Sequence, residues 1–146
     1  MASKNDVSFR VRYEETDSMQ TVYHANYLVW FEIGRTEFMR EQGISYREME
    51  EAGFGLVVVD ARVKFRRSAH YDDLVTVRTA LPAHSRLALK FEYTVHLGPD
   101  AAGPLLCEGS TILAFLDQGG RPHRMPGRYL DIIEKVSGGE KLNRRG

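Results

Sequence analysis

The chain has 146 residues, 42% of them hydrophobic and 10% aromatic, and its 20 basic residues equal its 20 acidic ones in number. This composition is typical of one globular domain with an apolar core, and the balanced charge, without a long basic block, argues against nucleic acid as a partner. No apolar run approaches the roughly 20 residues that cross a bilayer, and the first residues lack the layout of a signal peptide, so we expect a cytoplasmic protein that has no membrane partner.

The first half of the chain predicts a strand followed by a long helix. Residues 7–13 alternate between apolar and polar side chains, which indicates a strand with one buried face. A helical pattern begins between Tyr23 and Tyr27 and ends at Gly43, which is typical of a helix C-terminal cap. Apolar residues occupy most of the circumference, so we expect the helix to be covered on most sides. Gly34 faces these apolar residues and should allow a strand to come close.

The second half predicts a sheet. The expected elements are a short helix within 45–53, strands over 59–66, 75–81, 87–97 and 105–116, a connection at 82–85, and an amphipathic helix over 126–136. One antiparallel sheet wrapped around the long helix satisfies this order, which indicates an α+β protein. We therefore expect a single domain over 1–146, with an ordered core at 7–136 and a flexible tail at 137–146.

Asp17 is the first candidate for chemistry, because it lies where the first strand has ended and the helix is about to begin. Backbone N–H groups at a helix start are unpaired, and they can polarise a carbonyl group beside the carboxylate. Asp17 can equally be a residue that caps a turn or the helix. His24 allows two interpretations as well, a general base or a packed, hydrogen-bonded histidine.

The remaining polar candidates have structural explanations. Glu32 and Arg35 interrupt the apolar helix at a spacing that predicts an internal ion pair. Arg66 and Arg67 close the longest predicted strand, either as a solvated strand end or as a phosphate clamp. A lone cysteine, Cys107, excludes an internal disulfide and is expected to be a small buried residue, and with the histidines scattered we expect no metal site.

Residues 13–37 carry a longer motif, Y-x-x-T-D-x-x-x-x-V-Y-H-A-N-Y-L-x-W-F-E-x-x-R-T-E. It resembles the signature of the hot dog-fold acyl-CoA thioesterases, in the branch that contains the YbgC and 4-hydroxybenzoyl-CoA thioesterases. The resemblance implies a five-stranded antiparallel sheet wrapped around a long central helix. It also implies a homodimer or homotetramer with active sites at the subunit boundary, which hydrolyses an acyl-CoA substrate without a cofactor.

By the same resemblance, Asp17 matches the catalytic carboxylate, acting as nucleophile or general base, and the backbone N–H of His24 matches the donor that holds the thioester oxygen. The residues implied in substrate binding are Gln20, Tyr23, Asn26, Tyr27, Arg66 and Arg67. Gln20 is a departure, because the family usually has glycine at this position. It keeps one alternative open, a non-catalytic acyl-CoA or acyl-carrier-protein binding module. A hot dog hydratase or dehydratase is a second alternative, although the paired His and acidic residue that those enzymes use is not apparent.

Overall fold

The computed structural model describes residues 3–142 of the chain. Its elements, in chain order, are β1 (Lys4–Arg10), the 3-10 turn η1 (Tyr13–Glu15), α1 (Asn26–Glu41), α2 (Tyr46–Glu51), β2 (Gly55–Phe65), β3 (Leu74–His84), β4 (Ala88–Leu97), β5 (Leu105–Leu116), α3 (Gly127–Val136) and β6 (Glu140–Lys141).

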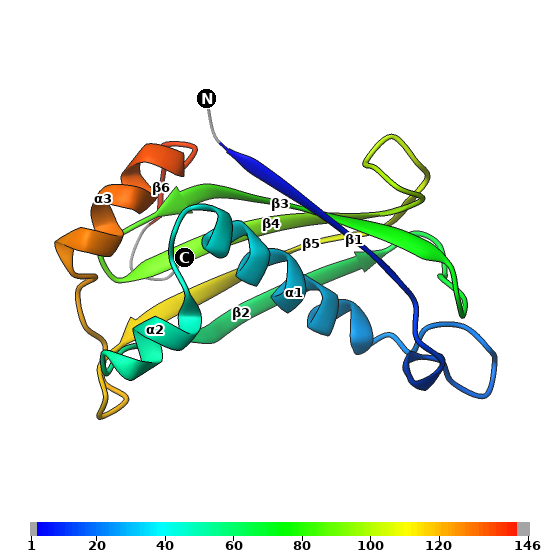
Figure 1. The fold of residues 1–146 in the computed structure, drawn as a ribbon, viewed down its shortest axis with the longest axis horizontal. Helices are drawn as coiled ribbons and strands as arrows, with labels where there is room; N and C mark the ends of the chain where they lie inside the picture. The colour runs from blue at the N-terminus through cyan, green and yellow to red at the C-terminus, as the bar shows by residue number, and fades with distance from the viewer. Residues whose placement is uncertain (1–2, 143–146) are drawn as a thin grey trace.

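The five long strands form one sheet in the order β1-β3-β4-β5-β2, and all pairings among them are antiparallel. The long helix α1 lies across one face of this sheet (Figure 1). It begins beside the loop that follows β1, at the end of the sheet away from α2 and α3 (Figure 1). The sheet and the helix confirm the architecture that the sequence predicts, and they place the segment around Asp17 at one end of the molecule.

The core lies between α1 and the sheet. The buried face of α1 carries Tyr27, Trp30, Phe31, Gly34, Phe38 and Met39. Phe31 stacks on Tyr93 of β4 with ring centroids 4.3 Å apart. At Gly34 the helix backbone meets β3 so closely that a Cβ atom would lie 2.5 Å from Thr79 Oγ1. The predicted close approach at Gly34 is therefore confirmed.

The other face of α1 is open within one chain. Leu28 and Val29 are 41% and 42% exposed, so the prediction of cover on most sides is wrong for a single copy. At the edge of the sheet, β2 also exposes apolar side chains, namely Val57, Val58, Val59 and Phe65. Because β2 has a strand partner on one side only, these side chains lie along a free sheet edge.

Several predicted boundaries are wrong. The strand predicted over 59–66 begins at Gly55 as β2. The first strand ends at Arg10 rather than at residue 13, because the Val11 N–H turns to the Asp73 carbonyl and Tyr13 lies in η1 with 77% of its surface exposed. Residues 82–84, predicted as part of a connection, belong to β3. A register shift between Ala80 and Ala83 lets the strand continue past Pro82, since a bulge tolerates the missing N–H of proline.

The chain after α3 returns to the sheet. The Gly138 N–H donates to the Leu81 carbonyl at 2.9 Å, and β6 pairs with β3 in parallel. Leu142 packs with Ala83 and Ile112. Strand pairing therefore extends beyond both ends of the expected 7–136 core, to β1 at the start and β6 at the end. Residues 143–146, the rest of the expected flexible tail, lie outside the described residues. No helix within 3–142 is long and apolar enough to cross a membrane.

Candidate active site

Asp17 lies on a tight hairpin between η1 and α1. Thr16 pairs with Val22 across this hairpin, and the Asp17 N–H donates to the Thr21 carbonyl at 3.0 Å. The Oδ1 atom of Asp17 accepts the N–H of Met19 at 2.9 Å, whereas Oδ2 has no hydrogen-bond partner among residues 3–142. The carboxylate is exposed, so one oxygen holds the turn and the other faces solvent.

The start of α1 offers free backbone donors. The Tyr23 N–H donates to the Glu15 carbonyl at 2.9 Å, and the Asn26 N–H donates to the Tyr23 carbonyl at 2.9 Å. Between them, the N–H groups of His24 and Ala25 have no acceptor in the part of the chain that the structure describes. Ala25 already has helical dihedral angles, φ −64° and ψ −23°, so these two N–H groups belong to the positive end of the helix dipole.

Asn26 and Tyr27 use their side chains within the protein. Asn26 Nδ2 donates to the Glu15 carbonyl at 2.9 Å. Tyr27 is 2% exposed, and its hydroxyl accepts the N–H of Ala69 at 3.1 Å. Burial raises the pKa of Tyr27, so its phenol stays neutral. These contacts fix the loop before α1 and the segment after β2 relative to the helix start.

A cleft of about 310 Å³ opens beside the start of α1. Its lining residues are Val22, His24, Tyr27, Phe65, Arg66, Arg67 and Ser68. Phe65 meets the His24 ring at a centroid distance of 6.4 Å and the Tyr27 ring at 5.4 Å, in both cases edge to face. Asp17 adjoins this cleft through its hairpin, because Val22, one of the lining residues, is the pairing partner of Thr16.

Two arginines, Arg66 and Arg67, line the same cleft. Arg66 Nη2 lies 3.2 Å from Glu108 Oε1 in a half-exposed ion pair. Arg67 is exposed and has no ion pair within residues 3–142. The structure therefore brings both sequence-predicted arginines to the same cleft as His24 and Tyr27, and it leaves Arg67 as the guanidinium with the fewer competing contacts.

Gln20 occupies the hairpin in a left-handed backbone conformation, with φ of 65°. Its N–H donates to the Asp17 carbonyl at 2.9 Å, which closes the turn. Glycine adopts this region without the steric cost that a Cβ atom brings. The preference for glycine at this position thus has a backbone explanation, and the exposed side chain of Gln20 is an addition to the rim of the site.

The predicted ion pair between Glu32 and Arg35 is wrong, because these side chains form no ion pair within 4.0 Å in the described structure. The positive charge of Arg35 instead acts on the phenols of Tyr46 and Tyr93. Burial raises the pKa of both phenols, and the charge of Arg35 offsets part of this rise. Arg35 Nε and the Tyr46 hydroxyl are buried without a hydrogen-bond partner among residues 3–142.

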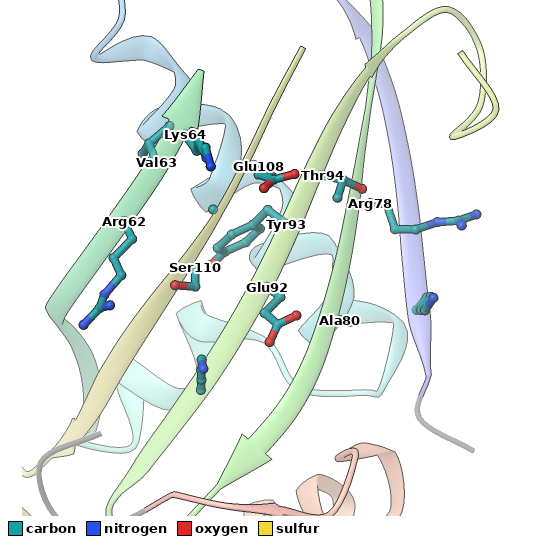
Figure 2. Close-up of a pocket in the computed structure, with 13 residues that line it drawn as sticks. Arg62, Val63, Lys64, Arg78, Ala80, Glu92, Tyr93, Thr94, Glu108 and Ser110 are labelled. Atoms are coloured by element: carbon teal, nitrogen blue, oxygen red, sulfur yellow. The ribbon is translucent and has the colours of Figure 1, made fainter. Parts of the chain in front are cut away.

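A larger hollow, of about 520 Å³, lies over β2, β5, β4 and β3. Figure 2 shows that its lining comes from neighbouring strands and includes Arg62, Lys64, Glu92, Glu108 and Ser110. Neither Asp17 nor any residue of α1 contributes to this lining. We place the candidate site at the smaller cleft, because His24, whose N–H has no acceptor within residues 3–142, lines it and Asp17 lies on the adjoining hairpin.

The structure adds a residue that the sequence pattern did not single out. Glu15, two positions before Asp17, is 3% exposed and accepts a hydrogen bond from Trp30 Nε1.

Cys107 is buried as expected, and burial raises its thiol pKa to about 12. No group of three or more His, Cys, Asp or Glu side chains within residues 3–142 is arranged to hold a metal ion.

An exposed carboxylate beside the start of a long helix, on an antiparallel sheet that packs against that helix, is the arrangement expected of a hot dog thioesterase. A model of the thioesterase-like superfamily matches residues 11–136, which include Asp17, α1 and the four strands β2 to β5. The chain belongs to this superfamily, and its fold is the hot dog fold. The resemblance that the motif around Asp17 indicated is therefore confirmed.

Particular relatives agree with this membership. The chain is 37% identical to YneP of Bacillus subtilis over 94 residues, which are 64% of this chain and 67% of that protein. It is 29% identical to the acyl-CoA thioester hydrolase YbgC of Escherichia coli over 108 residues, 74% of this chain and 78% of that protein. The solved structure of a DHNA-CoA thioesterase from Staphylococcus aureus matches with a TM-score of 0.85 at 31% identity, covering 91% of this chain and 90% of that one.

Proposed function

We propose that this protein hydrolyses an acyl-CoA thioester to the free acid and coenzyme A, with Asp17 as the catalytic carboxylate. The proposal depends on one observation. The segment that leads into α1 carries both an exposed Asp17 oxygen and the N–H groups of His24 and Ala25, which have no acceptor within residues 3–142. A carboxylate and an oxyanion donor are the two groups that acyl transfer requires.

The N–H of His24 donates a hydrogen bond to the thioester oxygen, and negative charge develops on that oxygen in the tetrahedral intermediate. The helix start stabilises this charge, because its donors and its dipole point toward it without reorganisation. Asp17 Oδ2 either attacks the thioester carbon, giving a mixed anhydride that water opens, or removes a proton from an attacking water. In both routes the carbon–sulfur bond breaks and the thiol leaves with a proton.

The cleft supports the orientation of the substrate. Tyr23, Gln20 and His24 are exposed around the helix start, and Asn26 and Tyr27 hold its backbone in place. Arg66 and Arg67 also line the cleft, and their guanidinium groups suit the phosphates of coenzyme A.

A second copy of the chain completes the acyl pocket. The exposed apolar side chains of Val57, Val58 and Val59 lie on β2, whose outer edge has no strand partner among residues 3–142. Pairing of two β2 edges would join two sheets and cover these side chains. Light scattering should find a dimer or tetramer of the parent protein, and Val59→Lys should shift it toward monomer.

Thiol release from a panel of short, medium and aromatic acyl-CoAs, followed with a thiol reagent, tests the activity. Asp17→Asn keeps the size of the side chain and its Oδ1 acceptor but removes the charge. We expect this variant to fold and to lose at least about a thousandfold of the parent's kcat/KM, since removal of a catalytic nucleophile or base typically costs this much or more.

Asp100→Asn is the matched control. Asp100 is exposed, and its Oδ1 accepts the N–H of Ala102 at 2.9 Å, the same contact that Asp17 makes with Met19. Asp100 lies in the loop between β4 and β5, so the activity of the Asp100→Asn variant should equal that of the parent. If the Asp17→Asn variant were as active as the parent, the proposed role of Asp17 would be wrong. If the parent bound acyl-CoA without releasing thiol, the protein would be a binding module.

Single turnover in ¹⁸O-labelled water can identify the nucleophilic route for Asp17, because only that route can place the label in the Asp17 carboxylate. If Asp17 attacks and water then opens the anhydride at the Asp17 carbonyl, the label enters the Asp17 carboxylate and the product acid carries an oxygen from the protein. If Asp17 acts only as a base, the label appears in the product acid and never in the protein.

A further inference from the structure

Glu15 is a buried carboxylate in the segment that carries the candidate site. It is 3% exposed, and both of its oxygens accept hydrogen bonds. Oε1 accepts the backbone N–H of Arg12 at 2.8 Å, which is the ordinary cap of the turn η1. Oε2 accepts Trp30 Nε1 at 2.7 Å, inside the first turns of α1. The second contact links the loop to the helix and has no part in capping.

The backbone of Glu15 makes the same connection. Its carbonyl accepts the N–H of Tyr23 at 2.9 Å and Asn26 Nδ2 at 2.9 Å. Glu15 therefore bonds to α1 and to the residues that enter it through three separate donors. The hairpin that holds Asp17 begins at the next residue, Thr16, so its base is fixed to the helix start by these contacts.

Trp30 gives this link a rigid anchor. It is fully buried, and its ring packs edge to face against Phe9 of β1 at 5.5 Å and against Tyr27 at 4.8 Å. A buried side chain held by aromatic rings from β1 and α1 cannot follow a loop that moves. The position of the Glu15 carboxylate is thereby set by β1 and α1 together, and not by the loop alone.

We propose that Glu15 is a positioning residue, which acts through its bridge to Trp30 to hold Asp17 in register with the free N–H groups at the start of α1. The proposal rests on the thioesterase mechanism above, in which Asp17 and the His24 N–H act on the same thioester. Displacement of one reacting group by about 1 Å can lower a rate about a hundredfold. Glu15 prevents such a displacement.

The chemistry of the bridge requires a carboxylate of this length. Two N–H donors approach from Arg12 and Trp30, and only an acceptor at both positions satisfies them. In Glu15→Gln the amide presents an NH₂ group to one donor, so one of the bonds is lost. In Glu15→Asp the side chain is one methylene shorter, and it cannot reach both donors from the same backbone position. Both changes conserve most of the volume of the site.

The kinetic test compares kcat and KM of the parent, Glu15→Gln and Trp30→Phe at a temperature well below unfolding. We expect each variant to lower kcat about tenfold to a hundredfold with KM within about threefold. The double variant should lose less than the product of the two single losses, because both changes weaken the same link between the loop and α1. A residue that only stabilised the fold would lower the melting temperature and leave the kcat of the folded protein unchanged.

Glu14→Gln is the matched control for charge and location. Glu14 precedes Glu15 in η1, its side chain is 70% exposed, and its ion pair with Arg12 does not involve Trp30. The activity of the Glu14→Gln variant should stay within twofold of that of the parent. If Glu15→Gln also stays within twofold of an active parent, the positioning role is wrong while the thioesterase function stands.

A second measurement needs no substrate and tests the link even if the parent hydrolyses no acyl-CoA. Amide hydrogen exchange of Asp17, Gln20 and Tyr23, which are all bonded within this loop, should become at least about tenfold faster in Glu15→Gln, with amides of β4 unchanged. The fluorescence of Trp30, the single tryptophan, should change in the same variant. Unchanged exchange in the loop would overturn the proposal.

Discussion

Gly34→Ala tests the contact on which the core depends. A Cβ at this position would lie 2.5 Å from Thr79 Oγ1 and 2.8 Å from Val77 Cγ1. Both neighbours are fully buried on β3 and cannot swing aside, so α1 must move away from the sheet. Overpacking of this kind costs about 1–3 kcal/mol, and the shift of α1 also loosens the packing of its aromatic residues. Alanine recovers at most about 1 kcal/mol of helix propensity, so the upper end of this range leaves a net loss of about 2 kcal/mol.

Gly127→Ala is the matched control, because Gly127 is the first residue of α3 and a Cβ there meets no heavy atom within 4 Å. The same substitution should be neutral or stabilise by up to about 1 kcal/mol at this position. Chemical denaturation should therefore give changes of opposite sign, and the melting temperature of Gly34→Ala should fall by about 4–8 °C. A Gly34→Ala variant as stable as the parent would refute the packing argument.

Three further predictions concern single side chains. Burial raises the pKa of Cys107 from the usual 9.0 to about 12. The buried neutral thiol therefore contributes to the free energy of unfolding below pH 9, and this contribution is lost as pH rises from 9 through 12. Cys107→Ala should flatten this decline in the free energy of unfolding, as measured by denaturation at several pH values. Arg67→Gln should raise KM for acyl-CoA several-fold but not for an acyl-pantetheine, which lacks the nucleotide phosphates, and equal effects on both would contradict the clamp. Because Gln20 has φ of 65°, Gln20→Gly should change the free energy of unfolding by less than about 1 kcal/mol, whereas Gln20→Val should lower it by about 1–2 kcal/mol, and equal stabilities would contradict the backbone explanation.

The sheet was predictable because its strands alternate. Phe91, Tyr93 and Val95 are buried while Glu92 and Thr94 are less so, and this period of two can be read without any structure. The continuation of β3 past Pro82 was not predictable, because the bulge that permits it depends on the register with β4. The pairing of β6 rests on two residues, which is too short for a period to be visible.

For the site, the residue types were predictable but their environments were not. Resemblance indicated Asp17 and the His24 N–H, whose roles stay predictions, and it named Asn26 and Tyr27 without indicating that their side chains bond to the protein itself. The spacing of Glu32 and Arg35 allowed an ion pair that the structure lacks. Helical spacing brings two side chains within reach, but the tyrosines of α2 and β4 near Arg35 come from distant parts of the sequence.

Glu15 and Asp17 show why burial cannot be read from spacing here. They are acidic residues two positions apart, and in a continuous strand they would face the same side. Instead η1 ends at Glu15, and the hairpin begins at Thr16, so the chain changes direction between them. Glu15 consequently points into the core, where Oε2 accepts the Trp30 N–H and Oε1 lies 3.6 Å from the Arg12 guanidinium, and Asp17 points to solvent with one oxygen free. A buried carboxylate with two donors is held in a single position, whereas an exposed carboxylate is free to react. We expect that neither residue tolerates a change of side-chain length. Asp17→Glu would displace the reacting oxygen, and Glu15→Asp would release the loop.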